Sequence, residues 1–117
     1  MAGIALADLK ARGGFVPLAP VAKEVTWKHT DESGAEVEDT FTVYVKRQSF
    51  GAIESIWASG EERSKSAAYI SQSIRLGEKG KDAISYEDAY QLDPGLAHVL
   101  ITAINEVNGT GRKEPKN

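Results

Sequence analysis

Two helices and both of their starts are encoded in residues Ser85–Gly109, SYEDAYQLDPGLAHVLITAINEVNG. Ser85 is followed three positions later by an acidic residue, which is the spacing of a capping box at a helix start. Asp93 and Pro94 predict the second start, because aspartate caps well and proline fits the first helical position. A glycine at position 109 predicts where this second helix ends.

The second of these helices carries a single apolar stripe. Its members recur at helical spacing and are Leu96, Val99, Leu100, Ala103, Ile104 and Val107. Such a stripe packs against a core, so the segment is expected to be a packing element with almost no catalytic chemistry.

The N-terminal half of the chain has the alternating pattern of strands. Val21–Thr30 is predicted as one strand, and a turn cluster at Asp31–Gly34 separates it from a second strand within Glu36–Arg47. In the second strand the apolar residues fall on odd positions, at Val37, Phe41, Val43 and Val45. The pattern therefore predicts an antiparallel hairpin over residues 21–47.

Short helices are predicted on both sides of this hairpin. The first spans Gly3–Arg12, ends at a pair of glycines and is too short to be stable unless it docks on something. Proline-containing residues 15–20 form an extended link to the hairpin. After the hairpin, Ser49 is expected to cap a helix over Phe50–Ser59 that ends at Gly60.

The remaining segments complete the expected architecture. Residues 61–76 favour a helix, but Ile70, Ile74 and Leu76 also share strand parity, so the sequence leaves open whether this segment is all helix or ends as a strand. Residues 77–82 are expected to be an exposed turn. The fold class is α+β, with an N-terminal β-hairpin followed by a C-terminal bundle of three to four helices. We expect one domain over residues 1–109 and a flexible tail over 110–117.

Composition excludes several classes of protein. The chain has 117 residues, a formal net charge of −3 and no cysteine. An acidic chain is poorly suited to nucleic acid or an anionic membrane surface, and no apolar run approaches the ~20 residues of a membrane span. From the charge and the lack of such a run, no nucleic acid and no membrane are expected as partners. The absence of cysteine separately excludes disulfides and thiolate metal sites.

The sequence contains no recognisable catalytic constellation. His29 and His98 do not have the spacing of metal ligands, and both are interpreted as solvated polar positions. The glycine-lysine run at 77–82 lacks the length and the following Ser or Thr of a phosphate-binding loop. We therefore expect no enzymatic activity, no metal and no cofactor.

Aromatic side chains are the best candidates for a contact surface. Those assigned to partner binding are Trp27, Phe41, Tyr44, Trp57, Tyr86 and Tyr90. Most aromatic residues in a chain of this length are needed to fill the core, whereas exposed Trp and Tyr dominate protein–protein interfaces. The sequence does not separate the two groups.

Residues 85–109 resemble the C-terminal part of the tail assembly chaperones of long-tailed siphophages. Those proteins carry a helix opened by Ser or Thr with acidic followers, a leucine before a second amphipathic helix, and an ending close to INEVNG, which is residues 104–109 here. Ile74–Ile84 resembles the segment that precedes this motif, and the region around Gln48–Gly51 fits by layout only. The family has no catalytic residues to transfer.

The resemblance implies a non-enzymatic assembly factor that acts in the host bacterial cytoplasm and is absent from the mature virion. Its implied partners are the tape measure protein and the tail tube protein, and the family implies self-association, for which the short N-terminal helix is well placed. It also implies a longer form made by ribosomal frameshifting, with which the codons possible for Pro115–Asn117 are compatible. The alternatives are a phage structural component, such as a tail tube or head–tail joining protein, and a generic protein-interaction module.

Overall fold

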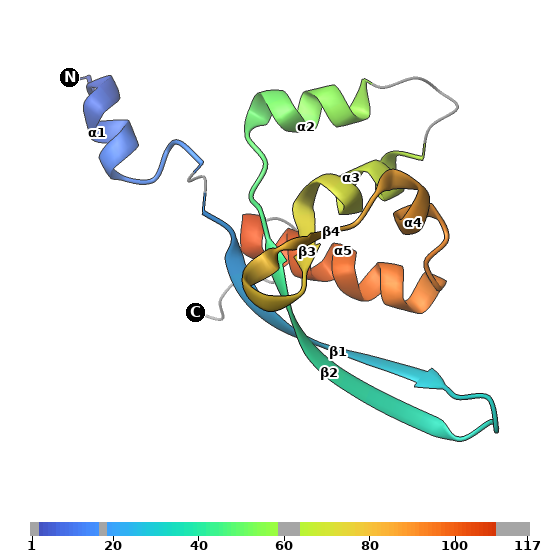
Figure 1. The fold of residues 1–117 in the computed structure, drawn as a ribbon. Helices are drawn as coiled ribbons and strands as arrows, with labels where there is room; N and C mark the ends of the chain where they lie inside the picture. The colour runs from blue at the N-terminus through green and yellow to red at the C-terminus, as the bar shows by residue number, and fades with distance from the viewer. Residues whose placement is uncertain (1–2, 17–18, 59–63, 110–117) are drawn as a thin grey trace, which may run out of the picture.

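A long β-hairpin beside a group of helices forms an α+β fold in the computed structural model, which describes residues 3–16, 19–58 and 64–109 (Figure 1). In chain order the elements are α1 (Leu6–Ala11), β1 (Val21–Thr30), β2 (Glu36–Val45), α2 (Phe50–Trp57), α3 (Lys65–Ser73), β3 (Ile74–Leu76), the 3-10 turn η1 (Glu78–Gly80), β4 (Asp82–Ala83), α4 (Tyr86–Tyr90) and α5 (Pro94–Asn108). The α+β class and the early hairpin are thus confirmed.

The sheet has four antiparallel strands in the order β1-β2-β3-β4, so the expectation of a hairpin followed only by helices is corrected. Strand β3 returns from between the helices and pairs with β2 at Tyr44–Arg75 and Val45–Ile74. Its three residues are too few for alternation to decide between helix and strand, and the pairing joins segments about thirty residues apart. The helix favoured within 61–76 is present as α3, and the strand that the sequence left open at its end is present as β3.

The hairpin keeps one register from end to end, from Val21 opposite Val45 to Thr30 opposite Glu36. Its turn is fixed by Asp31, whose Oδ1 accepts bonds from the backbone N–H groups of Ser33 and Ala35 at 2.9 and 3.0 Å. These local bonds set the turn geometry and therefore the register of both strands.

Side-chain caps start four of the helices. The oxygens of Ser49, Ser64, Ser85 and Asp93 accept backbone N–H bonds at 3.2, 3.1, 3.0 and 3.1 Å. Three of these caps were expected from the sequence, and so was the left-handed Gly109, with φ of 79°, that ends α5. The cap of α3 was not expected. The predicted end of the preceding helix at Gly60 and the predicted tail at 110–117 lie outside the described residues.

The core lies between the sheet and helices α3 and α5. Its buried residues come mainly from β2, α3 and α5 and include Val25, Val43, Val45, Ala67, Ile70, Ile74, Ile84, Ala89, Leu100, Ala103 and Ile104. Helix α5 packs chiefly against β1 and α3. Leu100, Ala103 and Ile104 of the predicted stripe are buried, which confirms that this stripe faces the core.

The predicted exposed turn at 77–82 is more ordered than expected. Gly80 is buried, has φ of +74°, and would bring an added Cβ to 3.0 Å from the Tyr44 Cβ. The Arg75 Nε donates a hydrogen bond of 2.7 Å to the Gly80 carbonyl oxygen. The turn therefore belongs to the packed body, held between β2 and β3.

Helix α1 stands apart from that body (Figure 1). It is shorter than the predicted Gly3–Arg12 and buries none of its residues. Together with the projecting hairpin it makes the molecule elongated, with a radius of gyration of 16.8 Å. A compact chain of this length would have about 13 Å.

Candidate functional site

A groove of about 340 Å³ lies between α2, α3 and α5. Its lining is mainly apolar and aromatic and consists of Ile53, Trp57, Ser66, Tyr69, Ile101 and Asn105. We call it the α2–α3–α5 groove. Each helix presents residues one turn or so apart: Ile53 and Trp57 on α2, and Ile101 and Asn105 on α5.

Trp57 and Tyr69 dominate this groove. Their ring centroids are 6.1 Å apart and the rings are tilted by 36°, which is a favourable aromatic arrangement. The Tyr69 hydroxyl donates to the Asn105 Oδ1 at 3.2 Å, so α5 fixes the position of the tyrosine. Trp57 stays 46% exposed at the end of α2. The groove thus combines Tyr69, which Asn105 holds in place, with Trp57, which a partner can cover.

Helix α2 is the least embedded of the helices that line the groove. Among its residues Ile56 is buried, whereas Phe50 at its other end is 78% exposed. The single aliphatic anchor leaves the outer surface of α2 free for contact. Phe50 does not line the groove, so α2 offers two exposed aromatic residues in different positions.

A second aromatic pair lies on α4. Tyr86 and Tyr90 have ring centroids 6.1 Å apart, with an interplanar angle of 27°. The Tyr86 hydroxyl accepts a 2.7 Å bond from the Ser64 N–H and so ties α4 to the start of α3. Tyr90 is the exposed member. This pair lies outside the groove lining.

The three aromatic residues of the hairpin that were assigned to partner binding are all half-buried. Phe41 lies opposite Val25 in the strand register, and Tyr44 packs against Gly80. Trp27 stacks on His29 with ring centroids 3.7 Å apart. The structure therefore brings Trp57 into a groove with Tyr69, and it distributes the other five assigned residues over the hairpin and α4.

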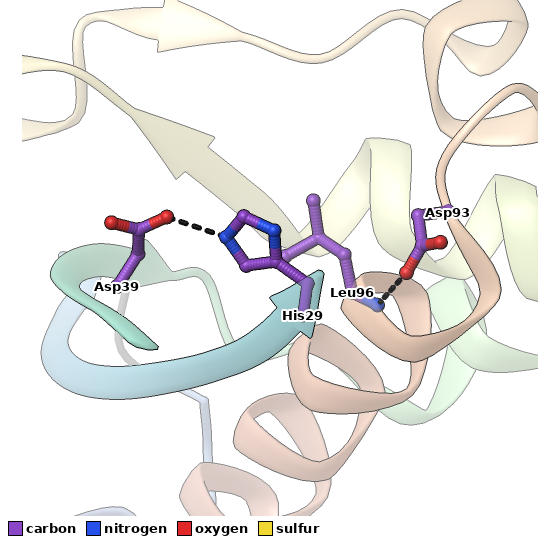
Figure 2. A network of polar contacts seen from close by, with 4 residues as sticks. All are labelled: His29, Asp39, Asp93 and Leu96. Carbon is purple, nitrogen blue, oxygen red and sulfur yellow. Dashed lines mark hydrogen bonds and ion pairs between the residues drawn. The ribbon is translucent and has the colours of Figure 1, made fainter. Parts of the chain in front are cut away.

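His29 is more constrained than a solvated histidine. Its Nε2 lies 2.7 Å from the Asp39 Oδ2 on the neighbouring strand, beside the start of α5 where Asp93 accepts the Leu96 N–H (Figure 2). The Asp39 side chain is 55% exposed, which makes this a surface contact. His98 is exposed on α5, as expected. The first of these contacts joins β1 to β2, and the second caps the start of α5.

Another concave surface lies between β1 and α5, where the Lys23 Nζ and the Glu106 Oε1 form an ion pair at 2.8 Å. Its lining also includes Glu24, Thr26, His98 and Thr102, so it is much more polar than the α2–α3–α5 groove. For a partner with an apolar surface, the α2–α3–α5 groove is the better fit.

Little in the described residues could perform chemistry. No group of three or more His, Cys, Asp or Glu residues that could hold a metal occurs among them. In the same part of the chain, no helix has the length and apolar character to cross a membrane. Hydrogen bonds lower the pKa of Asp31, first from the Ser33 side chain and then from the Ala35 backbone, and this carboxylate serves the hairpin turn.

The described residues form a small α+β fold with an apolar groove between α2, α3 and α5. A family model described as phage tail assembly chaperone, TAC, matches residues 7–108, and the chain belongs to this family. It is a family of non-enzymatic chaperones, in agreement with the expectation from the sequence. No curated protein and no solved structure gives a significant match.

Sequence reasoning missed Ile53, Tyr69 and Ile101 as members of the site. A signal was present in α5, because Ile101 is a large apolar residue that does not belong to the core stripe. A second signal was the spacing of Ile53 and Trp57, four residues apart on one helix. Their convergence depends on how three helices pack, which periodicity does not encode.

Proposed function

We propose that this chain binds helical segments of the tape measure protein in the α2–α3–α5 groove during tail assembly. The observation that carries the proposal is the exposed Trp57 in an apolar groove on a chain of the tail assembly chaperone family. Amphipathic helices bind such grooves through apolar side chains spaced by three or four residues.

The chemistry of the tape measure protein supports the same proposal. A tape measure protein is long and prone to form coiled coils, so its apolar stripes need cover until the tube encloses them. A partly exposed tryptophan at the edge of a groove is well suited to anchor such a stripe, because buried Trp and Tyr contribute most of the energy at interfaces. Of the six aromatic residues assigned from the sequence, Trp57 is the proposed main anchor and Tyr90 a secondary contact.

The wider role follows from this binding. The proposed chaperone is one domain over residues 1–109 that acts in the host cytoplasm, holds the tape measure protein and helps to recruit tail tube subunits. It leaves before the virion is complete. A longer form produced by frameshifting would add a segment after this domain.

Co-expression with the tape measure protein of the same phage tests the proposal. We expect the chain to raise the solubility of the tape measure protein and to co-purify with it. The complex should survive moderate salt, because it depends more on apolar burial than on charge pairs.

A matched pair of variants makes the experiment specific to the groove. Trp57→Ser should reduce co-purification strongly, whereas Phe50→Ser removes an exposed aromatic residue from the same helix and should have little effect. Equal solubility of the tape measure protein with and without the chain, and no co-purification, would refute the proposal. Detection of the chain in purified virions would favour a structural component instead.

A further inference from the structure

We propose that α1 of one copy docks in the α2–α3–α5 groove of a second copy. The sequence predicts self-association. In the proposed contact, α1 is the donor and the α2–α3–α5 groove is the acceptor. This contact concerns the chain without its tape measure protein; at any one groove, α1 of a second copy and a tape measure helix exclude each other.

The donor is a preformed helical motif that buries none of its residues against the described part of its own chain. Gly14 N–H donates to the Leu9 carbonyl at 2.8 Å and Gly13 N–H to the Lys10 carbonyl at 3.2 Å, which together form a Schellman motif at the end of α1. The Lys10 Nζ lies 5.0 Å from the Phe15 ring centroid and holds this ring beside the helix. The segment is therefore ordered locally although α1 buries no residue.

An isolated helix of six residues is only marginally stable in water, since helices of this length need tertiary packing. Leu6 and Leu9 are three positions apart, lie on one face, and are 60% and 41% exposed. Phe15 adds an exposed ring next to them. This apolar face is the kind of anchor set that helix-binding grooves accept.

The acceptor is apolar, and its helix α2 carries an acidic residue. The groove is a concave, mainly apolar surface with exposed Trp57 at its edge. Glu54 is the one charged residue of α2 and it is exposed, whereas α1 and the residue after it carry Lys10 and Arg12 against a single acid, Asp8. A basic helix end beside an acidic α2 would favour docking and set its direction.

The geometry favours a neighbouring copy over the chain's own groove. Helix α1 extends away from the body on the far side of its link to β1 (Figure 1). The described part of that link includes Pro20 just before β1, and its fixed φ limits the ways in which the link can fold back. An arm that is ordered but held away from its own body is suited to exchange between copies.

A complementation experiment tests the contact with the full chain. The donor variant is Leu6→Asp with Leu9→Asp, and the groove variant is Trp57→Ser, with Phe50→Ser as its control on the same helix. We expect the full chain and the control to self-associate in sedimentation. Each defective variant alone should associate at least about tenfold more weakly.

Mixing the two defective variants is the decisive test. The donor variant keeps an intact groove and the groove variant keeps an intact α1, so the mixture should form a 1:1 complex that neither forms alone. Circular dichroism melts would show that each variant is folded. The proposal is overturned if the full chain is monomeric at high concentration, if the donor variant associates like the full chain, or if the mixture stays monomeric.

The experiment uses no tape measure protein, so its failure leaves the proposed function untouched. Conversely, loss of co-purification with the tape measure protein would not affect sedimentation of the chain alone. If α1 instead folds back onto its own groove, every variant sediments as a monomer, and the second-copy proposal fails.

Discussion

Helices α1 and α5 both place leucines on one face, yet the molecule uses the two faces differently. In α5 the stripe containing Leu100 and Ile104 is buried against the sheet and α3. In α1 the stripe containing Leu6 and Leu9 is exposed. The same local pattern can thus serve a core or a contact surface, and tertiary packing decides between the two.

The largest expected effect separates these two helices directly. Leu100→Asp would place an unpaired charge in the core and should lower the free energy of unfolding by about 4 kcal/mol. Leu9→Asp should change it by about 0.5 kcal/mol or less when measured on the monomer. Chemical denaturation at low protein concentration measures both. Similar losses for the two variants would show that α1 belongs to the folded core.

Gly80 in the packed body and Gly14 at the end of α1 allow a second comparison of the two regions. Gly80→Ala introduces a Cβ at a φ of +74° and 3.0 Å from Tyr44, so it should cost about 1–3 kcal/mol of global stability. Gly14→Ala would bring a Cβ to 2.8 Å from the Leu9 carbonyl oxygen. Because this clash is confined to the end of α1, it should reduce helicity there and leave the melting temperature of the body unchanged. A large drop in that temperature for Gly14→Ala would contradict the comparison.

Much of the fold follows from local signals in the sequence. The caps at Ser49, Ser85 and Asp93 and the alternation in the hairpin are read within a few residues, and the structure contains all of them. The missed features depend on distant contacts. Strand β3 is defined by its pairing with Tyr44 and Val45, so the alternation at Ile74 and Leu76 could not decide between helix and strand.

The site was harder to predict than the fold for the same reason. Trp57 was among the residues assigned to partner binding, and that assignment stays a prediction; nothing in the sequence places it beside Tyr69 and Ile101. Those residues come from three helices that meet only after the core has formed. Likewise, the roles of Trp27 and Tyr44 depend on neighbours across the sheet and turn.

Helix caps allow a smaller and more selective comparison. Asp93→Ala removes the side chain that accepts the Leu96 N–H and should cost about 1 kcal/mol. Helix α1 starts at Ala5 without a side-chain cap, so Ala5→Asp should raise the helicity of the N-terminal segment. Thermal melts should show a change for the first variant and almost none for the second. NMR chemical shifts of residues 6–11 would report the gain in helicity.

The smallest expected effect concerns the hairpin turn. The pKa of Asp31 is lowered in the folded state, so its ionised form contributes stability above the pKa of the unfolded chain. This contribution is lost as the pH falls through the folded-state pKa. Asp31→Asn should slightly reduce the dependence of the free energy of unfolding on pH in the acid range. Hydrogen exchange of the turn amides is the most sensitive measurement. An unchanged profile would show that the turn does not depend on this carboxylate.

Photo-crosslinking tests the central claim about the groove most directly. A photo-reactive phenylalanine analogue would replace either Trp57 or Phe50, and each variant would be co-expressed with the tape measure protein. We expect crosslinks from position 57 into helical segments of the tape measure protein and few from position 50. Crosslinks from position 50 alone, or from neither position in a complex that still co-purifies, would contradict the assignment of the α2–α3–α5 groove as the binding surface.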